Sequence, residues 1–460
     1  MTKKREITVG IVSLGCPKNV VDTERMLAEI AQAGFAITAE PDNADVVVVN
    51  TCGFIAPAQA ESLDAIRHAV DCKRTGAVKK VIVAGCLSER SGTGLVHQIE
   101  GIDAVIGLAQ RDLVAKIIGE FFHSSRNSDR KTADEPILSP SGPLASSPSA
   151  GGIADDRCRL LITPRHWAYL RISEGCDRRC SFCTIPSIRG RFRSKPREMI
   201  LAEAEELVSA GVVELNVIAQ DTTCYGRDLK EPNGLSSLIK ELDNIDRLTW
   251  LRLMYLYPAG IDATLIETIA GSRKVVHYLD IPIQHVSDPI LRAMHRPDTG
   301  EAIRRLIEDL RRAMPDIVLR TTMMVGFPGE SDGQFAELLD FVKWAQFDAL
   351  GCFRFYPEEG TQAAQMAGQV PDELKQQRLD ELMRTQQQIA FAKNESRVGQ
   401  RLMCLTDSVD ADGVGRGRFY GQAPDIDSVC IVRKGRVRPG RFIATKVVAA
   451  QDYDLLVERI

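Results

Sequence analysis

The chain has 460 residues, of which 44% are hydrophobic and 26% charged, and this length and composition are typical of a globular protein with more than one domain. Lys and Arg total 58 against 62 Asp and Glu, so the overall charge gives no general attraction to nucleic acid or anionic membranes. No apolar run approaches the ~20 residues of a membrane span, and the N-terminus lacks the apolar core of a secretory signal. We therefore expect a cytoplasmic protein with no membrane partner, in which twelve cysteines are more typical of metal binding or catalysis than of disulfides.

The first 122 residues alternate between strand-like and helix-like patterns. Apolar runs at 7–14, 45–50 and 80–85 predict buried strands. After the first run, a helical pattern begins with Asp22 or Thr23 as N-cap and ends at Gly34. Continuous apolar strands separated by helices predict a parallel sheet covered on both faces, so we expect a Rossmann-like α/β domain over 1–122.

Residues 123–160 are dominated by Ser, Pro, Ala, Gly and charged residues, which predicts a linker without a core of its own. The alternation then resumes and predicts an open, partial (β/α)6 barrel over 161–395, ending in a long polar helix at 371–396. Its strands are expected at 168–172, 214–219, 250–254, 278–283, 318–325 and 349–355. The tail, 396–460, has short strand patterns with Gly and Asp turns, typical of a small antiparallel, OB-like β-barrel.

A cysteine-rich loop follows the first expected barrel strand. Cys176, Cys180 and Cys183 lie within eight residues, at the strand end where β/α barrels build their active sites. Three thiolates so close together favour one iron–sulfur or zinc centre. A closed zinc site needs a fourth Cys or His, and none lies nearby in the sequence. A four-iron cluster with three protein ligands would leave one iron open, and this is the favoured interpretation, with structural zinc as the alternative.

Weaker signals follow other barrel strands. Gln220 ends the second strand, Gln284 and His285 follow the fourth, and Gly326 and Glu330 follow the fifth. Glycine lets the backbone approach a ligand closely, and a carboxylate such as that of Glu330 would hold an ammonium group. The alternative is a turn with a carboxylate at a helix N-terminus, and a lone His is more often structural than catalytic.

Three further cysteines each follow an apolar strand of the N-terminal domain. Cys16, Cys52 and Cys86 are far apart in the sequence, but each comes directly after one of the expected strands. Ligands of open parallel sheets bind at the carboxyl ends of the strands, so the three thiols are expected to converge on a second centre. The alternative is that they are small buried residues, which accounts for one cysteine but poorly for three at equivalent positions.

The loop from Cys176 to Cys183, with Phe182 before its last cysteine, resembles that of the radical S-adenosylmethionine enzymes. The resemblance implies that its three cysteines bind a [4Fe–4S] cluster whose open iron is chelated by S-adenosylmethionine. It also implies a 5′-deoxyadenosyl radical that abstracts hydrogen from an unactivated carbon. The residues expected to contact S-adenosylmethionine are Phe182, Gln220, Gln284, Gly326 and Glu330.

The chain apart from the linker resembles the methylthiotransferase branch of these enzymes. The resemblance implies a second [4Fe–4S] cluster on Cys16, Cys52 and Cys86, and a C-terminal substrate-binding TRAM domain. The run Leu14-Gly15-Cys16-Pro17-Lys18-Asn19 and the segments 164–169, 185–190, 280–285 and 453–455 resemble the members that act on small-subunit ribosomal protein S-twelve. This second resemblance thus implies methylthiolation of an aspartate β-carbon, with S-adenosylmethionine as radical source and methyl donor. Further partners are the small ribosomal subunit, a reducing electron donor and a sulfide or sulfur donor.

Other functions are weighed against this interpretation. The tRNA-modifying members of the branch usually carry Gln-Met-Asn after the first cysteine, so a tRNA adenosine is the alternative target. A non-catalytic, RNA-binding iron–sulfur sensor is an alternative of another class, and the cysteine loop argues against it. A dinucleotide dehydrogenase fits worst, because no Gly-x-Gly-x-x-Gly follows the first strand.

The tail has eleven Lys or Arg against eight Asp or Glu, which suits either a contact with ribosomal RNA or solvated strand faces. Most of its positive charge comes from Arg416, Arg418, Arg433, Lys434, Arg436, Arg438 and Arg441. No role is assigned to six cysteines, namely Cys72, Cys158, Cys224, Cys352, Cys404 and Cys430.

Overall fold

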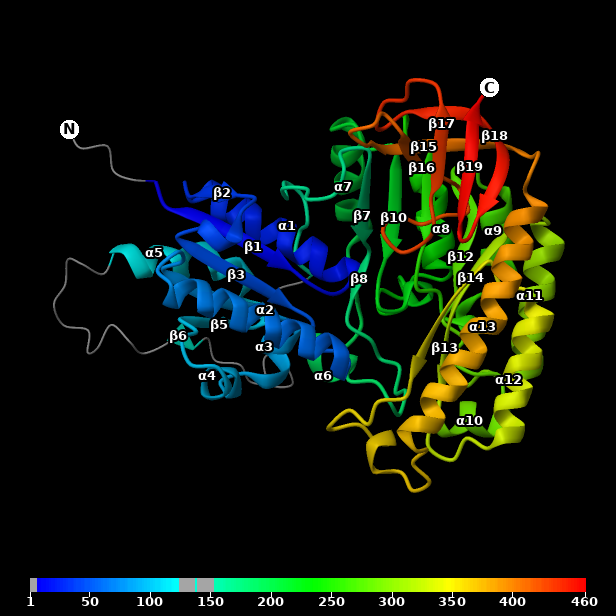
Figure 1. Ribbon diagram of the computed structural model, residues 1–460, viewed down its shortest axis with the longest axis horizontal. Coiled ribbons are helices and arrows are strands. Elements are labelled where there is room, and N and C mark those ends of the chain that lie inside the picture. Colours follow the sequence, from blue (N-terminus) through cyan, green and yellow to red (C-terminus); the bar gives the residue numbers. More distant parts are fainter. Residues whose placement is uncertain (1–5, 124–136, 139–152) are drawn as a thin grey trace. The chain divides into compact units, whose positions relative to one another are not determined.

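The computed structural model describes residues 6–123, 137–138 and 153–460 (Figure 1). The chain forms two compact units. The first comprises 1–162 with 174–178 and 183–193, and the second comprises 163–173, 179–182 and 194–460. Among the described residues, no helix has both the length and the apolar composition that crossing a bilayer requires.

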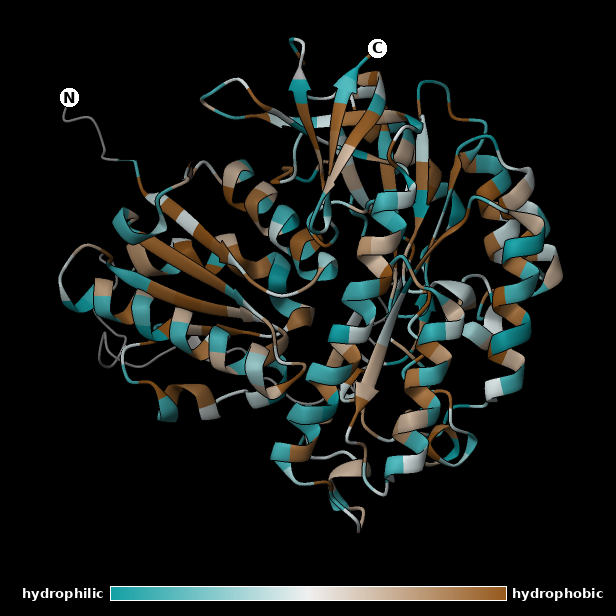
Figure 2. Cartoon of the chain, turned by 45° about the vertical axis from the view of Figure 1, so that its right-hand side comes forward, coloured by the Kyte–Doolittle hydropathy of each residue, from teal (hydrophilic) through white to brown (hydrophobic). Residues whose placement is uncertain are grey.

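A parallel sheet forms the centre of the first unit, as the apolar runs predict. All its neighbouring strands run parallel, and every residue of Val46–Thr51 is buried because both faces of the sheet are covered. Figure 2 shows its strands as the most apolar part of this unit. The strand order is β2 (Ala36–Thr38), β1 (Thr8–Ser13), β3 (Val46–Thr51), β4 (Lys80–Gly85), β5 (Ala104–Ile106) and β6 (Ile137–Leu138).

Helices connect these strands. The first begins at Pro17 with Cys16 as its N-cap, so the expectation of a start at Asp22 or Thr23 is wrong. Proline has a backbone angle suited to the first turn of a helix and needs no hydrogen-bond acceptor there, which accounts for the earlier start. The helices are α1 (Pro17–Gln32), η1 (Pro41–Asn43), α2 (Ala56–Arg74), α3 (Cys86–Ser91), α4 (Gly94–Gln98), η2 (Leu108–Leu113) and α5 (Val114–His123).

The end of the expected linker packs against α1. Arg159 is buried, and its Nε donates to Glu24 Oε2 at 2.8 Å. Asp156 is also buried and pairs with Arg25 at 3.3 Å. This stretch therefore belongs to the first unit, whereas 124–136 and 139–152 of the expected linker lie outside the described residues.

The second unit contains the open, six-stranded parallel sheet expected for a partial barrel. Its neighbouring strands all run parallel, which confirms the α/β fold class. The order is β14 (Ala349–Arg354), β13 (Val318–Val325), β12 (Val275–Asp280), β11 (Trp250–Leu253), β10 (Glu214–Ile218) and β7 (Trp167–Arg171). The short strands β8 (Ser173–Glu174) and β9 (Arg193–Ser194) pair separately.

Helices alternate with the strands of this sheet. A Ser331 capping box begins α12, and the long polar helix expected at 371–396 is α13. The set is α7 (Arg197–Ser209), η4 (Thr222–Cys224), α8 (Gly234–Leu242), η5 (Pro258–Gly260), α9 (Ala263–Gly271), α10 (Asp288–Ala293), α11 (Gly300–Ala313), α12 (Asp332–Ala345), η6 (Ala363–Gln365) and α13 (Asp372–Ser396). The short helix α6 (Ile185–Arg189) belongs to the first unit.

The tail forms a closed five-stranded barrel, as expected, with one difference in strand direction. Four of its neighbouring pairs are antiparallel, but β17 and β19 run parallel. The order around the barrel is β15 (Arg401–Val409), β16 (Gly415–Phe419), β17 (Cys430–Lys434), β19 (Asp454–Arg459) and β18 (Phe442–Gln451).

Buried ion pairs join this barrel to the amino ends of the central strands. Arg418 contacts Glu214, the first residue of β10, at 2.7 Å and Asp407 at 2.9 Å, and Asp407 also binds His166 Nε2 at 2.8 Å. Burial opposes ionisation of Asp407, but the hydrogen bonds from His166 and Arg418 lower its pKa overall. Arg418 is therefore buried between the barrel and the sheet, so neither alternative that the sequence left open, an RNA contact or a solvated strand face, applies to this residue.

Candidate metal centres

The three N-terminal cysteines lie at the same edge of the first sheet. Cys16 follows β1, Cys52 follows β3 and Cys86 is the first residue of α3 after β4. These strands are neighbours in the sheet, so their carboxyl ends place the three cysteines at one edge, and their binding of a common metal centre stays a prediction.

Two glycines allow the cysteine loops to pack closely. Gly15 has φ +88°, and a Cβ added there would lie 2.8 Å from Cys52 Cβ. A Cβ added to Gly53 would lie 2.8 Å from the carbonyl oxygen of Cys86. Because such contacts are too short for any side chain, glycine is required at both positions.

Two buried asparagines hold the same loops. Asn19 Nδ2 donates to the carbonyl oxygens of Leu14 at 3.0 Å and Thr51 at 2.8 Å. Asn50 Nδ2 donates to the carbonyl oxygen of Asn19 at 2.9 Å. The Cys86 thiol in turn donates to Asn19 Oδ1 at 3.5 Å. Asn19 is thus a cross-brace between all three loops, a role that sequence reasoning missed although the residue stands in the quoted Cys-Pro-Lys-Asn run.

The environment of these thiols fits a polynuclear centre better than a single ion. Burial raises the pKa of Cys86 to about 12 and also raises that of Cys52, so a bound metal has to replace the protons. Within the part of the chain that the structure describes, the three sulfurs do not all lie within 4.8 Å of one another. Thiolates on one zinc ion would be about 4 Å apart. The wider spacing and the all-sulfur donor set suit an iron–sulfur cluster.

Arg189 extends this site to the strand end that precedes the second cysteine set. Its guanidinium is buried and binds Asn19 Oδ1 at 2.6 Å, Asp22 at 3.0 Å and Cys86 Sγ at 3.4 Å. Its other nitrogen binds Glu174 at 3.1 Å. Within the first unit, one side chain therefore contacts a cysteine of the sheet edge and the residue two positions before Cys176.

Backbone amides point at two sulfurs of the Cys176–Cys183 loop. The N–H of Arg178 donates to Cys176 Sγ at 3.4 Å, and the N–H of Ile185 donates to Cys183 Sγ at 3.5 Å. Such bonds favour thiolate over thiol and tune iron–sulfur clusters. Gly175 has φ +77°, and a Cβ there would lie 2.1 Å from the carbonyl oxygen of Arg191, so only glycine fits before Cys176.

The 179–182 segment is fixed within the second unit. Ser181 Oγ donates to the carbonyl oxygen of Ala293 at 2.7 Å, and the Ser181 carbonyl accepts from Ala363 N–H at 2.8 Å. Phe182 packs in a hydrophobic cluster that also contains Phe327 and Phe355. The structure therefore brings Phe182 to the loop of Gly326 and Glu330, as expected if these residues line one site.

Glu330 binds its own loop in this structure. Its Oε2 accepts from the N–H groups of Gly326 at 2.5 Å and Phe327 at 3.2 Å, and its Oε1 accepts from Arg378 at 3.1 Å. Burial raises the pKa of Glu330, partly offset by Arg378. These contacts make Glu330 an organiser of the 326–330 turn, and its direct contact with S-adenosylmethionine stays a prediction.

The segment after β12 has an unusual backbone. Gln284 adopts φ +72°, a conformation that is uncommon outside glycine and that clusters at functional sites. The next residue, His285, is buried, and its Nδ1 accepts from Ser287 N–H at 3.0 Å. Among the described residues, its Nε2 has no hydrogen-bond partner. Burial lowers the pKa of His285 to about 3. The side chain is thus neutral, with an N–H available to a bound molecule.

One face of the central sheet is polar, which sequence reasoning missed. In-register residues of parallel strands share a face, and the register places Tyr169, Asn216 and Arg252 together and Asp280 beside Arg320. Neither polar atom of the buried Asn216 amide has a hydrogen-bond partner in the part of the chain that the structure describes. The alternation that reveals this face is visible in Glu214-Leu-Asn-Val-Ile and Trp250-Leu-Arg-Leu. Other residues of this face contact the C-terminal barrel, because Arg252 donates to the carbonyl oxygen of Tyr420 at 2.6 Å and Arg320 lies 3.4 Å from Asp427.

The remaining cysteines lie elsewhere. Cys404 and Cys430 are buried in the C-terminal barrel, and Cys158 is exposed. Cys224 donates to Asp221 at 3.1 Å, and Cys352 lies on β14. Cys72 lies on α2 beside His68. None of them joins either set of three.

Three stretches of the chain match protein families. Residues 8–107 match the Uncharacterized protein family UPF0004, 170–342 match the Radical SAM superfamily, and 398–460 match the TRAM domain. These stretches correspond to the first sheet, the central sheet and the C-terminal barrel.

Curated relatives match over nearly the whole chain. The ribosomal protein uS12 methylthiotransferase RimO of Acetivibrio thermocellus is 43% identical over 454 residues, which cover 98% of each chain. The protein of the same name from Geobacter sulfurreducens is 42% identical over 455 residues, again 98% of each chain.

Among solved structures, the radical S-adenosylmethionine methyltransferase TsrM from Kitasatospora setae, with tryptophan and a SAM analogue bound, matches with a TM-score of 0.54. The match covers 88% of this chain and 79% of that chain at 13% identity. At this identity the likeness concerns the fold alone.

Proposed function

The chain belongs to the RimO family of radical S-adenosylmethionine methylthiotransferases, and on that premise we propose that it methylthiolates an aspartate of ribosomal protein uS12. The observation that carries the proposal is the 43% identity over nearly the full length of both chains. The match to the radical SAM superfamily means that the chain uses S-adenosylmethionine and an iron–sulfur cluster.

We assign Cys176, Cys180 and Cys183 as ligands of the cluster that binds S-adenosylmethionine, and Cys16, Cys52 and Cys86 as ligands of a second cluster. When bound, these groups supply electron transfer for sulfonium cleavage and a place for the sulfur that is transferred. In the net reaction an aspartate C–H becomes C–S–CH3. One S-adenosylmethionine would give its methyl group to the sulfur and leave as S-adenosylhomocysteine. Another, cleaved by one electron, would take up the hydrogen as 5′-deoxyadenosine and leave methionine, and one electron would be returned when the methylthiolate joins the substrate radical. The sulfur comes from a sulfide or sulfur donor, and a reducing donor supplies the electron that starts cleavage.

The residues around the cysteines position and shield these ligands. Asn19 holds the loops of Cys16 and Cys52 through the carbonyls of Leu14 and Thr51. Arg189 brings a positive charge to Cys86 Sγ at 3.4 Å, which favours the thiolate needed for metal binding. Its contact with Glu174 connects the site of Cys86 to the strand end that precedes Cys176. Arg189 thus acts as a positioning residue for both cysteine sets.

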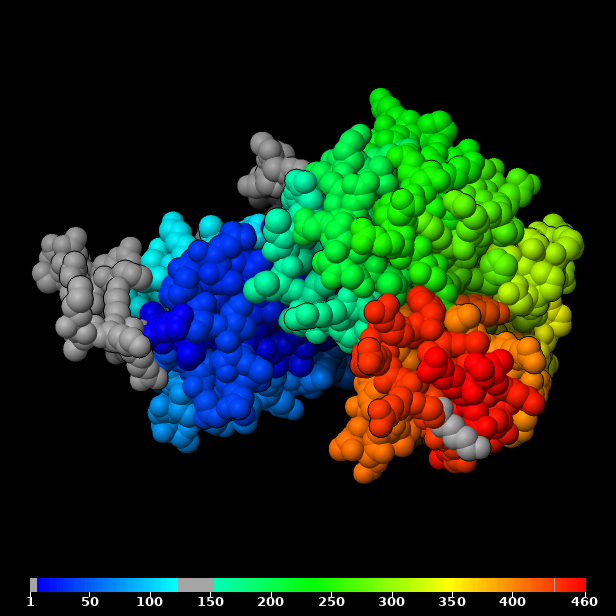
Figure 3. All heavy atoms as spheres, turned by 90° about the horizontal axis from the view of Figure 1, so that it is seen from above, coloured from blue at the N-terminus to red at the C-terminus, as the bar shows by residue number. Residues whose placement is uncertain are grey.

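The C-terminal barrel provides a surface for the ribosomal partner. Five of its exposed arginines lie on β16, on β17 and between β17 and β18, namely Arg416, Arg433, Arg436, Arg438 and Arg441. Figure 3 draws the atoms of the barrel in orange and red. Arginines spaced along adjacent strands and one loop suit phosphate contacts with ribosomal RNA. Such contacts would hold the small subunit near the enzyme without selecting the aspartate.

The proposal is tested with the anaerobically reconstituted enzyme, S-adenosylmethionine, a reductant and sulfide. Small ribosomal subunits and tRNA, each from a strain lacking the gene, serve as parallel substrates. We expect mass spectrometry to find one methylthio group in place of one hydrogen on a uS12 aspartate, and none on tRNA. Methylthiolated adenosine in tRNA together with unmodified uS12 would show that the proposed target is wrong and that the proposed type of reaction is right. Cleavage of S-adenosylmethionine without either product would overturn both.

A further inference from the structure

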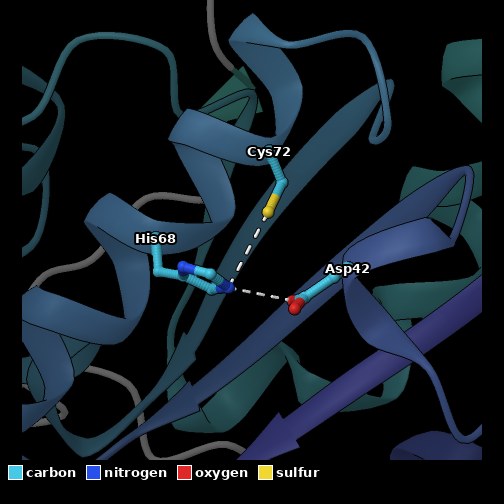
Figure 4. Close-up of side chains that lie close together, drawn as sticks. All are labelled: Asp42, His68 and Cys72. Atoms are coloured by element: carbon cyan, nitrogen blue, oxygen red, sulfur yellow. Dashed lines mark hydrogen bonds and ion pairs between the residues drawn. The ribbon is translucent and has the colours of Figure 1, made fainter.

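A cluster of metal-ligating side chains lies on the first unit, away from the cysteine loops. His68 and Cys72 lie one turn apart on α2, and Asp42 lies on η1. The three side chains point toward one another, with His68 Nε2 between the other two (Figure 4). One ligand atom from each residue lies within 4.8 Å of the others, the only such group of three or more among the described residues.

The distances in this cluster match the edges of a zinc coordination tetrahedron. His68 Nε2 lies 3.1 Å from Asp42 Oδ1 and 3.7 Å from Cys72 Sγ. With zinc–ligand bonds of about 2.0–2.3 Å, a tetrahedron has an N···O edge of about 3.4 Å and an N···S edge of about 3.6 Å. A single ion would therefore need only small side-chain movements to contact all three atoms.

The backbone under each ligand is well anchored. A Cβ added to Gly10 would lie 2.5 Å from Pro41 Cα, so η1 packs tightly on β1 and fixes the position of Asp42. The carbonyl of Cys72 accepts three hydrogen bonds, from Thr75 Oγ1 at 2.9 Å and from the N–H groups of Ala77 and Val78. The ligands are thus held by two rigid elements, which reduces the entropy lost when a metal binds.

The ligand types and their exposure favour a labile divalent ion. The side chains of His68 and Asp42 are 64% and 60% exposed, so an ion can enter from solvent, and a fourth position stays open to water. Asp42 and Asp71 also lie close enough to Cys72 to place negative charge around it. A thiolate, an imidazole and a carboxylate together are typical ligands of zinc.

We propose that Asp42, His68 and Cys72 form a surface site for one zinc ion, which ties η1 to α2 independently of the iron–sulfur chemistry. The alternative is that the three side chains only hydrogen-bond to one another. If an ion binds there, the affinity of the protein for zinc depends on all three residues. If the side chains only hydrogen-bond to one another, the wild-type protein retains no zinc at this position.

The test uses the full chain with its iron–sulfur clusters reconstituted, treated with one equivalent of Zn²⁺ and desalted. We compare wild type with His68→Ala, Cys72→Ser and the control His97→Ala, which removes an exposed histidine of the same unit. Zinc and iron are measured by elemental analysis. We expect about one zinc per chain in wild type and His97→Ala. The other two variants should retain little zinc, because removing a ligand weakens metal binding by more than the ~10–100-fold typical of removing a residue that hydrogen-bonds to a ligand. Iron content should be equal in all four.

A second measurement identifies the ligands directly. Co²⁺ bound to wild type should give a thiolate-to-cobalt absorption band that Cys72→Ser lacks and His97→Ala keeps. Equal zinc in all four proteins would place the metal elsewhere and overturn the proposal. Desalted wild type without zinc, or a cobalt band that survives Cys72→Ser, would overturn it as well.

Discussion

The two sets of three cysteines are built in opposite ways. Cys176, Cys180 and Cys183 are close in sequence, and backbone N–H groups of their own loop point at two of the sulfurs. Cys16, Cys52 and Cys86 are brought together only by the strand order of a sheet, and asparagine side chains and Arg189 brace their loops. A centre defined by one loop depends on local sequence, whereas a centre at a sheet edge depends on the whole fold. Substitutions away from the cysteines should therefore affect the second kind more.

The largest expected effect separates the roles of the two sets. Cys183→Ala should lower formation of 5′-deoxyadenosine to below about 1% of wild type. Removing a metal ligand should reduce activity by more than the roughly 100-fold loss typical of removing a residue that hydrogen-bonds to a ligand. Cys52→Ala should keep formation of 5′-deoxyadenosine and lose methylthiolation to the same extent. Both products are measured by mass spectrometry in one reaction.

Cys404→Ala provides the control, since this buried cysteine belongs to neither set; both products should persist. If Cys52→Ala still methylthiolated uS12, the two sites would not divide the reaction between them, and the comparison would fail.

The next effect tests the bracing of the sheet-edge site. Arg189→Met would remove the buried cation that pairs with Asp22 and Glu174, although Asp22 would keep its ion pair with Arg111. Breaking a buried ion pair from one side costs about 3–5 kcal/mol, so the urea unfolding of the first unit should lose that much free energy. Arg191→Met, which changes an exposed arginine two residues away, should leave stability unchanged. Equal unfolding curves for Arg189→Met and wild type would show that the brace is not needed.

Acid should weaken the second unit through His285. Burial lowers its folded pKa to about 3, while the unfolded side chain titrates near 6.5. The unfolded chain therefore binds the proton first as the pH falls from 6.5 toward 3, and stability is lost in that window. Between pH 7 and pH 5 the loss should be about 2 kcal/mol, measured by urea unfolding at both values.

His285→Asn retains an acceptor for Ser287 N–H and removes the titrating group. The difference between pH 7 and pH 5 should shrink by that amount in this variant. An unchanged difference would mean that other groups set the acid sensitivity of the unit.

The smallest effect concerns the barrel surface. Reversing the exposed charges in Arg433→Glu with Arg436→Glu should weaken binding to small ribosomal subunits about tenfold, or about 1.4 kcal/mol, and lower the salt dependence of binding. Formation of 5′-deoxyadenosine without subunits should not change. Lys446→Glu on β18 is the matched control, and an equal loss of binding in that variant would point to charge in general rather than to this surface.

The sequence predicted the parts of the fold that repeat a simple pattern. Fully apolar runs such as Val46–Val49 can only be buried strands, and their spacing implied the parallel sheets. The start of α1 was misjudged because apolar periodicity points to Met26 and Leu27, whereas Pro17 begins the helix. The parallel pairing of β17 and β19 depends on how the barrel closes, which no local pattern records.

The candidate sites show the same division. The short spacing of Cys176, Cys180 and Cys183 predicts one centre directly. The other three cysteines are recognised because each follows the end of a predicted strand. Arg189 could not be given its role, because its contacts with Asn19 and Cys86 span 170 and 103 residues. Arg418 looked like a surface charge, but its partners Glu214 and Asp407 come from two different domains. Long-range polar pairing of this kind is decided by tertiary packing rather than by sequence pattern.

The most direct test of the two-site account is the iron content of anaerobically reconstituted protein. Wild type is compared with a variant in which Cys16, Cys52 and Cys86 are all replaced by alanine, and with another in which Cys176, Cys180 and Cys183 are replaced. The account predicts that each variant retains half of the wild-type iron and sulfide, with S-adenosylmethionine cleavage only in the first. Full iron in the first variant, or loss of all iron in either, would contradict two separate three-cysteine centres.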